Sequence, residues 1–119
     1  ACDTDPNALA AARLNAAANA VAIQTLAADL LEGAPPEADL VLAGDLFYDP
    51  ALAPRVLAFL DACAAAGLKV LVGDIGRAPL PVERLAPLAT YPVPDFGDPP
   101  GAPLRAATVY GLMGRKDVP

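Results

Sequence analysis

The sequence is most informative at residues 40–50, which read Leu40-Val41-Leu42-Ala43-Gly44-Asp45-Leu46-Phe47-Tyr48-Asp49-Pro50. The apolar run that opens this stretch is bounded by turn signals, a pattern typical of a strand buried on both faces in a parallel sheet. Asp45, Phe47 and Tyr48 follow the carboxyl end of that strand, where ligands bind in open α/β sheets. We therefore expect these three side chains to line an acidic, aromatic pocket suited to a cation.

An aspartate closes each of several predicted strands along the chain. These residues are Asp3, Asp29, Asp45 and Asp74. On parallel strands they would all point toward one edge of the sheet, the edge at which small molecules bind. A single aspartate after a strand is usually a turn former or a helix cap. Four aspartates that each close a strand favour a ligand-binding site at that edge of the sheet.

Apolar periodicity and cap signals predict alternating strands and helices. Asp5-Pro6 and Asp49-Pro50 each pair a good N-cap with a good first helical residue. Gly67 is placed to end the second helix as a left-handed cap. The expected elements are a strand tail within residues 1–6, a helix over 7–20, a strand over 21–29, a loop with at most one helical turn over 30–37, a helix over 50–66, a strand over 68–72, a short helix over 81–89 and a strand over 91–93.

The length of the chain allows one domain. We expect a single α/β domain over residues 1–119, with α/β units over 1–93, a loop over 94–105 and a last strand over 106–113. The final two strands have no helix between them, which predicts an antiparallel hairpin that closes an otherwise parallel sheet. The last residues, 115–119, are expected to form a tail.

Composition and charge exclude several classes of function. The chain has 119 residues, a net charge of −6, eight lysines plus arginines, two cysteines and no histidine. Without a basic cluster we expect no nucleic-acid partner, and without a long apolar stretch or a basic leader we expect neither a membrane segment nor a secretory signal. The missing histidine removes the usual general base and most transition-metal sites, so no metal is expected. Two cysteines indicate a reducing, cytoplasmic location.

The strand-end acids suit the recognition of a nucleotide-like cofactor. An acid at the end of the second strand of a nucleotide-binding fold accepts hydrogen bonds from ribose hydroxyls, and Asp3 is placed for that role. Asp29 is placed to receive the amine of an adenine ring. Asp45 is near the centre of the crevice, where a sulfonium or a substrate amine would gain from its charge. The rings of Phe47 and Tyr48 would add about 0.5 to 2 kcal/mol to a bound cation, or else they simply pack under a loop.

Three short segments together resemble one enzyme family. Asp3-Thr4-Asp5-Pro6, with Asn15 and Asn19 after it, resembles the segment that follows the glycine-rich loop of class I, seven-stranded S-adenosylmethionine-dependent methyltransferases. Gly44-Asp45-Leu46-Phe47-Tyr48-Asp49 and Gly73-Asp74-Ile75-Gly76-Arg77 resemble a narrower branch. That branch holds the electron transfer flavoprotein β-subunit lysine methyltransferase and neighbours the ribosomal protein L11 methyltransferases. The resemblance extends over residues 1–112.

The resemblance implies a Rossmann-like sheet of order 3-2-1-4-5-7-6, S-adenosyl-L-methionine as cofactor and methyl transfer to a lysine of a protein. The acceptor would be the electron transfer flavoprotein β-subunit or a ribosomal protein. Carried over by position, Asp3, Asp29 and Asp45 would bind the cofactor, and Asp45 and Tyr48 would be catalytic. Phe47, Tyr48 and Asp74 would bind the substrate. The reaction is an in-line displacement that needs a neutral amine, so the site chiefly positions and desolvates it.

The sequence departs from the family pattern in two places. Ile75 stands where relatives usually carry proline. The first strand and its glycine-rich loop are absent, and no G-x-G-x-x-G occurs downstream. In the order given above, that strand lies in the middle of the sheet. We therefore expect this chain to correspond to the C-terminal portion of a methyltransferase domain, and to be inactive by itself.

Other functions remain open at this point. The chain has no Tyr-x-x-x-Lys pair or histidine, which a nicotinamide-dependent dehydrogenase would need. A signalling receiver domain would need a lysine at the end of a late strand, whereas Lys69 is at the start of its strand. A non-catalytic cofactor-binding or protein-interaction module is one alternative, and a methyltransferase that acts on a small metabolite is another.

Overall fold

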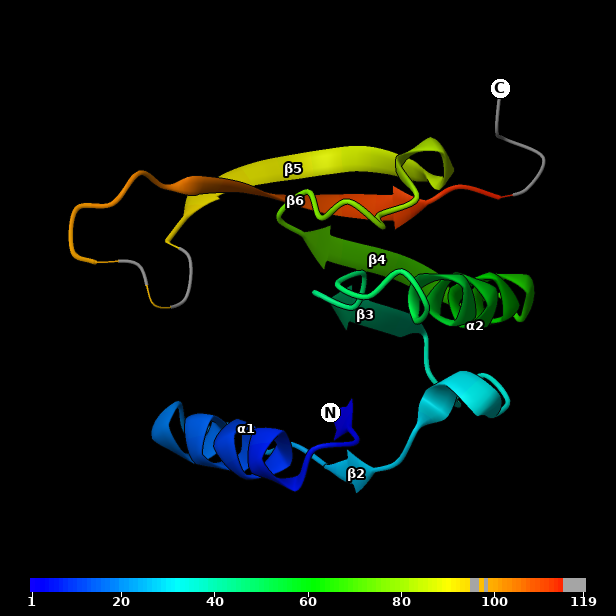
Figure 1. Ribbon diagram of the computed structural model, residues 1–119. Helices are drawn as coiled ribbons and strands as arrows, with labels where there is room; N and C mark the ends of the chain where they lie inside the picture. Colours follow the sequence, from blue (N-terminus) through cyan, green and yellow to red (C-terminus); the bar gives the residue numbers. More distant parts are fainter. Residues whose placement is uncertain (95–96, 98, 115–119) are drawn as a thin grey trace. The chain divides into compact units, whose positions relative to one another are not determined.

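The computed structural model describes residues 1–94, 97 and 99–114, and divides the chain into two compact units, Ala1–Ala34 and Pro35–Pro119 (Figure 1). Each unit is described by itself below. Both contain parallel strands and a helix, so the chain has an α/β fold. The expected single domain over residues 1–119 stays a prediction. Part of the expected loop after residue 93 and the expected tail from residue 115 lie outside the described residues.

The first unit consists of a short parallel strand pair and a helix, followed by one helical turn. Strands β1 (Cys2–Asp3) and β2 (Leu26–Ala27) pair in parallel. Helix α1 (Pro6–Ala18) begins as the Asp-Pro pair predicts, because the Asp5 side chain accepts a hydrogen bond from the Asn7 amide at 2.8 Å. The 3₁₀ turn η1 (Leu30–Glu32) confirms that at most one helical turn follows.

The strand expected over residues 21–29 is much shorter in the structure. Only Leu26 and Ala27 pair, because their partner β1 is two residues long. Val21, at the expected start, instead donates its amide hydrogen to the Ala16 carbonyl oxygen at 3.0 Å, which keeps it bonded to the end of α1. The prediction was wrong because the length of a strand is limited by the partner with which it can pair.

The second unit contains a mixed sheet of order β3-β4-β6-β5. Strands β3 (Leu40–Gly44) and β4 (Lys69–Asp74) are parallel, and their register pairs Gly44 with Gly73. Strands β5 (Leu85–Val93) and β6 (Arg105–Leu112) are antiparallel to each other, and β6 is antiparallel to β4 (Figure 1). The expected antiparallel hairpin beside parallel strands is therefore present.

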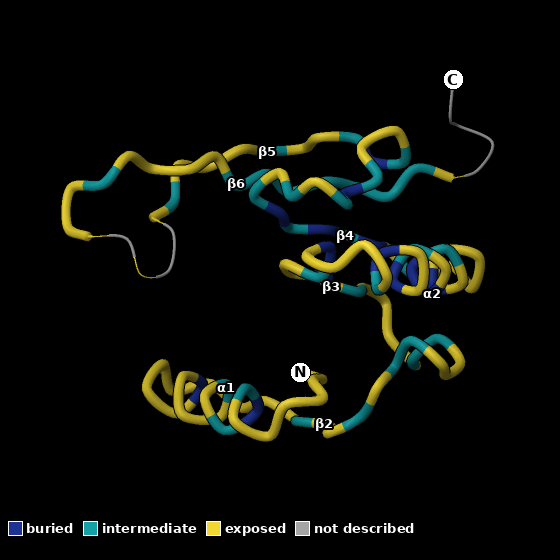
Figure 2. Tube along the Cα trace, viewed as in Figure 1, coloured by how far each residue is buried: buried dark blue, intermediate teal, exposed yellow. Residues whose placement is uncertain are grey.

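The core of the second unit lies between helix α2 (Ala53–Ala65) and the sheet. The buried residues of α2 recur at helical spacing and form one apolar stripe, and the helix packs against β4 and β6. Figure 2 shows buried residues concentrated in α2 and β4. Gly67 has φ 91°, the left-handed conformation expected of it at the end of the helix. The buried residues of the stripe and of the strand beneath it are Val56, Phe59, Leu60, Cys63, Val70 and Val72.

Helix α2 begins later than the Asp49-Pro50 pair predicts. The Asp49 carboxylate accepts a hydrogen bond from the Ala51 amide at 2.8 Å, and the Asp49 carbonyl oxygen accepts from Leu52 and Ala53. These bonds close a separate turn before the helix. Pro54 then occupies the first helical turn, where its missing N–H costs no hydrogen bond.

Strand β3 is not buried on both faces, contrary to the expectation from its apolar run. Ala43 is buried, whereas Leu42, on the opposite face of the strand, is 71% exposed. The reason is that β3 forms one edge of its sheet, and α2 packs on one face of that sheet. The apolar run predicts a strand correctly, but it does not tell how many of its faces are covered.

The prediction of a helix over residues 81–89 was wrong. One 3₁₀ turn, η2 (Val82–Arg84), leads directly into β5, in which Leu85 pairs with Leu112. Pro87 could not donate a helical hydrogen bond. In the sheet, β5 has a register shift between Pro87 and Ala89, which accommodates the missing N–H.

The two cysteines differ in exposure, which predicts a difference in reactivity. Cys63 is fully buried, and burial raises the pKa of its thiol, whereas Cys2 is exposed. We expect a thiol reagent such as dithionitrobenzoate to modify one cysteine per chain in the folded protein and two in urea, because the thiolate is the reacting form. Rapid modification of Cys63 in the folded protein, identified by mass spectrometry, would contradict the packing of α2.

Candidate functional site

The carboxyl ends of β3 and β4 are joined by an ion pair. Asp45 follows β3 and Arg77 lies in the loop after β4, and parallel pairing brings both loops to the same edge of the sheet. The Arg77 guanidinium donates from Nε to Asp45 Oδ1 and from Nη2 to Asp45 Oδ2, the latter at 2.9 Å. Two parallel hydrogen bonds fix both the position and the orientation of the carboxylate.

The backbone of Asp45 is also held in an unusual conformation. Its φ is 51°, in the left-handed region that aspartate tolerates better than most residues. The Asp45 amide donates a hydrogen bond to the Gly73 carbonyl oxygen at 2.9 Å, which continues the β3–β4 ladder by one step. Backbone and side chain are therefore both tied to the β4 side of the unit.

Arg77 sets the charge of the site. Its hydrogen bonds hold the pKa of the Asp45 carboxyl below the ordinary value of 3.8, although burial opposes this lowering. The Asp45 side chain is 59% exposed, so solvent screens the pair. Asp45 is thus ionised at neutral pH, and Arg77 compensates its charge. An incoming cation meets an ion pair there, not a lone carboxylate.

Asp74 holds the loop that carries Arg77. It is only 3% exposed, and its Oδ1 accepts hydrogen bonds from the amides of Gly76 at 2.7 Å and Arg77 at 2.8 Å. Gly76 has φ 84°, a left-handed conformation that glycine adopts in this tight turn without the strain that a side chain would cause. Oδ2 of Asp74 is also buried and accepts no hydrogen bond from the described residues. Asp74 therefore positions Arg77, and its expected contact with substrate stays a prediction.

The two aromatic residues after Asp45 have opposite environments. Phe47 has no exposed surface and belongs to the core, whereas Tyr48 is 60% exposed. The burial of Phe47 agrees with the alternative expectation that this ring packs under a loop, and its expected role in substrate binding stays a prediction. A ring that follows a strand end gains most by packing beneath the loop, where it anchors the loop that carries Asp45 and Tyr48.

The strand-end acids of the first unit have local hydrogen bonds. Asp3 Oδ1 accepts from the Asp5 amide at 2.8 Å, and Asp29 Oδ1 accepts from the Leu31 amide at 2.9 Å. Both residues are exposed. These turn and cap bonds do not test a role in cofactor binding. The convergence of the four acids on one edge stays a prediction, as does each expected site role.

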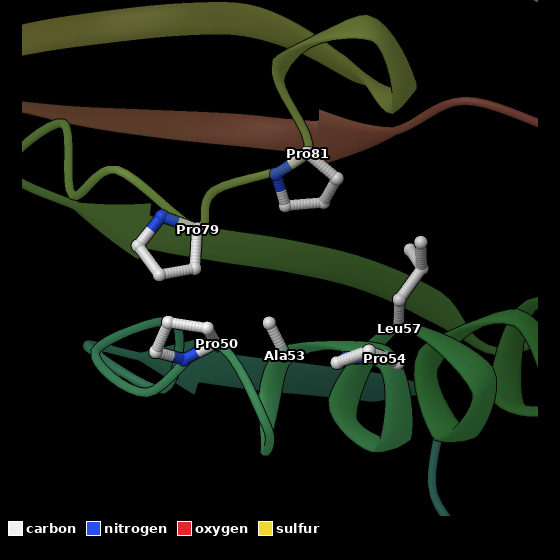
Figure 3. Close-up of a pocket in the computed structure, with 6 residues that line it drawn as sticks. All are labelled: Pro50, Ala53, Pro54, Leu57, Pro79 and Pro81. Atoms are coloured by element: carbon white, nitrogen blue, oxygen red, sulfur yellow. The ribbon is translucent and has the colours of Figure 1, made fainter.

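An apolar groove, which the sequence analysis does not anticipate, lies in the second unit (Figure 3). Its volume is about 340 Å³. The signal in the sequence was a pair of prolines shortly after each of the Asp45 and Arg77 motifs. Among the described residues, no group of three or more potential metal ligands occurs, and no helix is long and apolar enough to cross a membrane. The residues that line the groove are Pro50, Ala53, Pro54, Leu57, Pro79 and Pro81.

Comparison with known proteins gives one informative similarity. The electron transfer flavoprotein beta subunit lysine methyltransferase of Danio rerio is 40% identical to this chain over 78 residues. The matched segment covers 64% of this chain and 30% of the relative, so the chain spans less than a third of that protein's length. No protein-family model matches the chain, and no solved structure matches it. The similarity relates the chain to a methyltransferase.

The Asp45–Arg77 pair predicts a pH-dependent contribution to stability. Because the pKa of Asp45 is lowered in the folded state, its contribution is complete above the unfolded pKa and disappears as the pH falls through the folded value. Arg77→Met should raise that pKa toward its ordinary value and cost at most about 1 kcal/mol of unfolding free energy at pH 7. The cost should vanish once the pH is below the folded pKa of Asp45.

The measurements are NMR titration of the Asp45 carboxyl and urea unfolding at several pH values. Lys69→Met is a matched control, because it removes one positive charge at the other end of β4. The same pKa of Asp45 in the wild type and in Arg77→Met would show that the ion pair does not form in solution.

Proposed function

We propose that this chain is part of an S-adenosylmethionine-dependent methyltransferase that methylates a lysine side chain of a protein. The observation that carries this proposal is the 40% identity over 78 residues to a lysine methyltransferase. The name of that relative gives its acceptor as the electron transfer flavoprotein beta subunit, and we propose an acceptor of the same kind here. A cytoplasmic location is part of the proposal.

The strand orders within the two units support a Rossmann-like domain. In the second unit, β3-β4-β6-β5 with its antiparallel hairpin is the order expected of strands 4-5-7-6. In the first unit, β1 and β2 are parallel neighbours, as expected of strands 2 and 3. Each unit, taken alone, agrees with one side of the sheet that the resemblance implies.

The acids of the first unit fit the cofactor by their chemistry. An ionised carboxylate accepts several hydrogen bonds, so a bond to a local amide does not prevent it from also binding a ligand. Asp3 would accept hydrogen bonds from the ribose hydroxyls, and Asp29 would accept one from the adenine amine. Both residues are exposed. Bound S-adenosylmethionine supplies an electrophilic methyl group on a sulfonium. Asp45 is proposed to be near that group.

Asp45 and Tyr48 are proposed to orient the lysine amine. Arg77 holds Asp45 in one orientation, and the hydroxyl of the exposed residue Tyr48 offers a second hydrogen-bonding group on the same loop. The displacement needs a neutral amine, so a proton must leave the lysine ammonium. Because Arg77 compensates the charge of Asp45, the site stabilises an ammonium less than a lone carboxylate would. This lowers the cost of releasing that proton to water.

Methyl transfer tests the proposal directly. The full-length protein, incubated with S-adenosylmethionine labelled in the methyl group and a cell extract, should label a protein at lysine. Asp45→Asn should lower the rate by about tenfold or more, because the amine loses an oriented acceptor. Glu37→Gln is a control, since it removes an exposed acid from another loop of the same unit.

The label distinguishes the competing functions. A labelled small molecule in place of a labelled protein would favour a metabolite methyltransferase. No label at all would favour a non-catalytic cofactor-binding or interaction module. Equal rates for wild type and Asp45→Asn would remove Asp45 from the proposed site.

Calorimetry of the isolated 119-residue chain is a separate test. The sequence contains no G-x-G-x-x-G segment to hold the methionine part of the cofactor. We therefore expect the chain alone to bind S-adenosylmethionine feebly or not at all, in contrast to the full-length protein. Micromolar binding by these residues alone would refute this expectation.

A further inference from the structure

The apolar groove lies between the start of α2 and the loop that joins β4 to η2. Figure 3 shows Pro79 and Pro81 on one wall, with Pro50 and Pro54 on the other. Its volume of about 340 Å³ is near the lower limit of ligand pockets, which range from about 300 to 1,000 Å³. It is therefore large enough for a side chain and small for a cofactor.

The walls of the groove are preorganised. Proline rings fix their own backbone angles and have little freedom to lose when a ligand binds. Leu80, between the two prolines of one wall, is buried, and its amide donates a hydrogen bond to the Arg77 carbonyl oxygen at 3.0 Å. On the other wall, Ala53 is buried at the start of α2. A ligand would thus meet a rigid surface.

The groove continues from the proposed amine site along the chain. Pro50 is two residues after Tyr48, and Pro79 is two residues after Arg77. The loop that carries Arg77 therefore supplies one wall of the groove, and the loop that carries Asp45 supplies Pro50 of the other wall, which α2 completes. We therefore expect a peptide held at Asp45 to present a neighbouring residue to this apolar surface.

We propose that the groove binds an aliphatic side chain of the acceptor protein, a few residues from the lysine that is methylated. This inference rests on the proposed function and deepens it, because it names a feature of the substrate. The groove's lining side chains are all uncharged and apolar, and without polar groups it could not orient a free small molecule. A side chain of the acceptor protein needs no polar groups in the groove, because the nearby lysine, bound at Asp45, already positions its backbone.

Charge complementarity favours a lysine-bearing segment as the occupant. Asp49 is exposed on the loop that leads into the groove, and the chain has a net charge of −6. A basic segment is attracted to this surface. An uncharged aliphatic residue near the lysine would then bind favourably in the groove. A charged or polar residue would bind less well, because it would lose its hydration there.

Peptide substrates test the inference with the full-length protein. Each peptide carries one lysine in a Gly-Ser background, and a single leucine is moved through the positions on either side of it. At one or two positions, leucine should lower KM by about tenfold or more relative to serine. The value of kcat should change little, because the groove contributes equally to the binding of substrate and transition state.

A variant on the wall of the groove should abolish this preference. Leu57→Gln places a polar group at the groove, so leucine and serine peptides should then have the same KM. Ala62→Gln is the matched control, because residue 62 is exposed on the same helix and does not line the groove. If circular dichroism shows that Leu57→Gln does not fold, Pro54→Gln replaces it, since Pro54 lines the groove but is exposed.

The outcomes separate the inference from the proposed function. Methylation of lysine with no preference for leucine at any position would overturn the inference and leave the proposed function in place. A preference that survives in the groove variant would also overturn it. No methylation of any lysine by the wild-type protein, in peptides or in a cell extract, would overturn the proposed function itself.

Discussion

The parallel pairing of β3 with β4 is the constraint on which the candidate site depends. Because the two strands run in the same direction and pair Gly44 with Gly73, the loops that follow them leave the sheet at one edge. Asp45 and Arg77 meet there although 32 residues separate them. A slip of one residue in this register would turn the side chains of β3 to the opposite face and break the pair.

Packing beneath the loops holds this arrangement. Phe47 and Leu80 are both buried, and each anchors one of the loops. Helix α2 covers the sheet below them with Val56 and Leu60, which are buried almost completely. Deleting such a side chain costs several kcal/mol in a well-packed core, about 2 to 5 for leucine and 3 to 5 for phenylalanine. The exposed residues of the site thus depend on buried neighbours for their positions.

The ion pair changes how the acidic residues are to be understood. A row of strand-end aspartates suggests a site that attracts cations. The structure instead compensates Asp45 with Arg77 and buries Asp74 as the acceptor of a turn. A carboxylate oriented in this way fits a reaction in which the amine must be neutral, because strong stabilisation of an ammonium would oppose the loss of its proton.

The sequence alone determined the local features of the structure. The helix cap at Asp5, the left-handed conformation of Gly67 and the apolar stripe of α2 could be predicted because each depends on neighbours within a few residues. Only the tertiary structure decided the contacts between distant segments. Residues 85–89, which were expected to be helical, belong to β5 because β6 pairs with them, and Phe47 is buried because it packs into the core. The bond between Asp45 and Arg77 arose only when two parallel strands fixed both loops, since no local pattern encodes the distance between residues far apart in the chain.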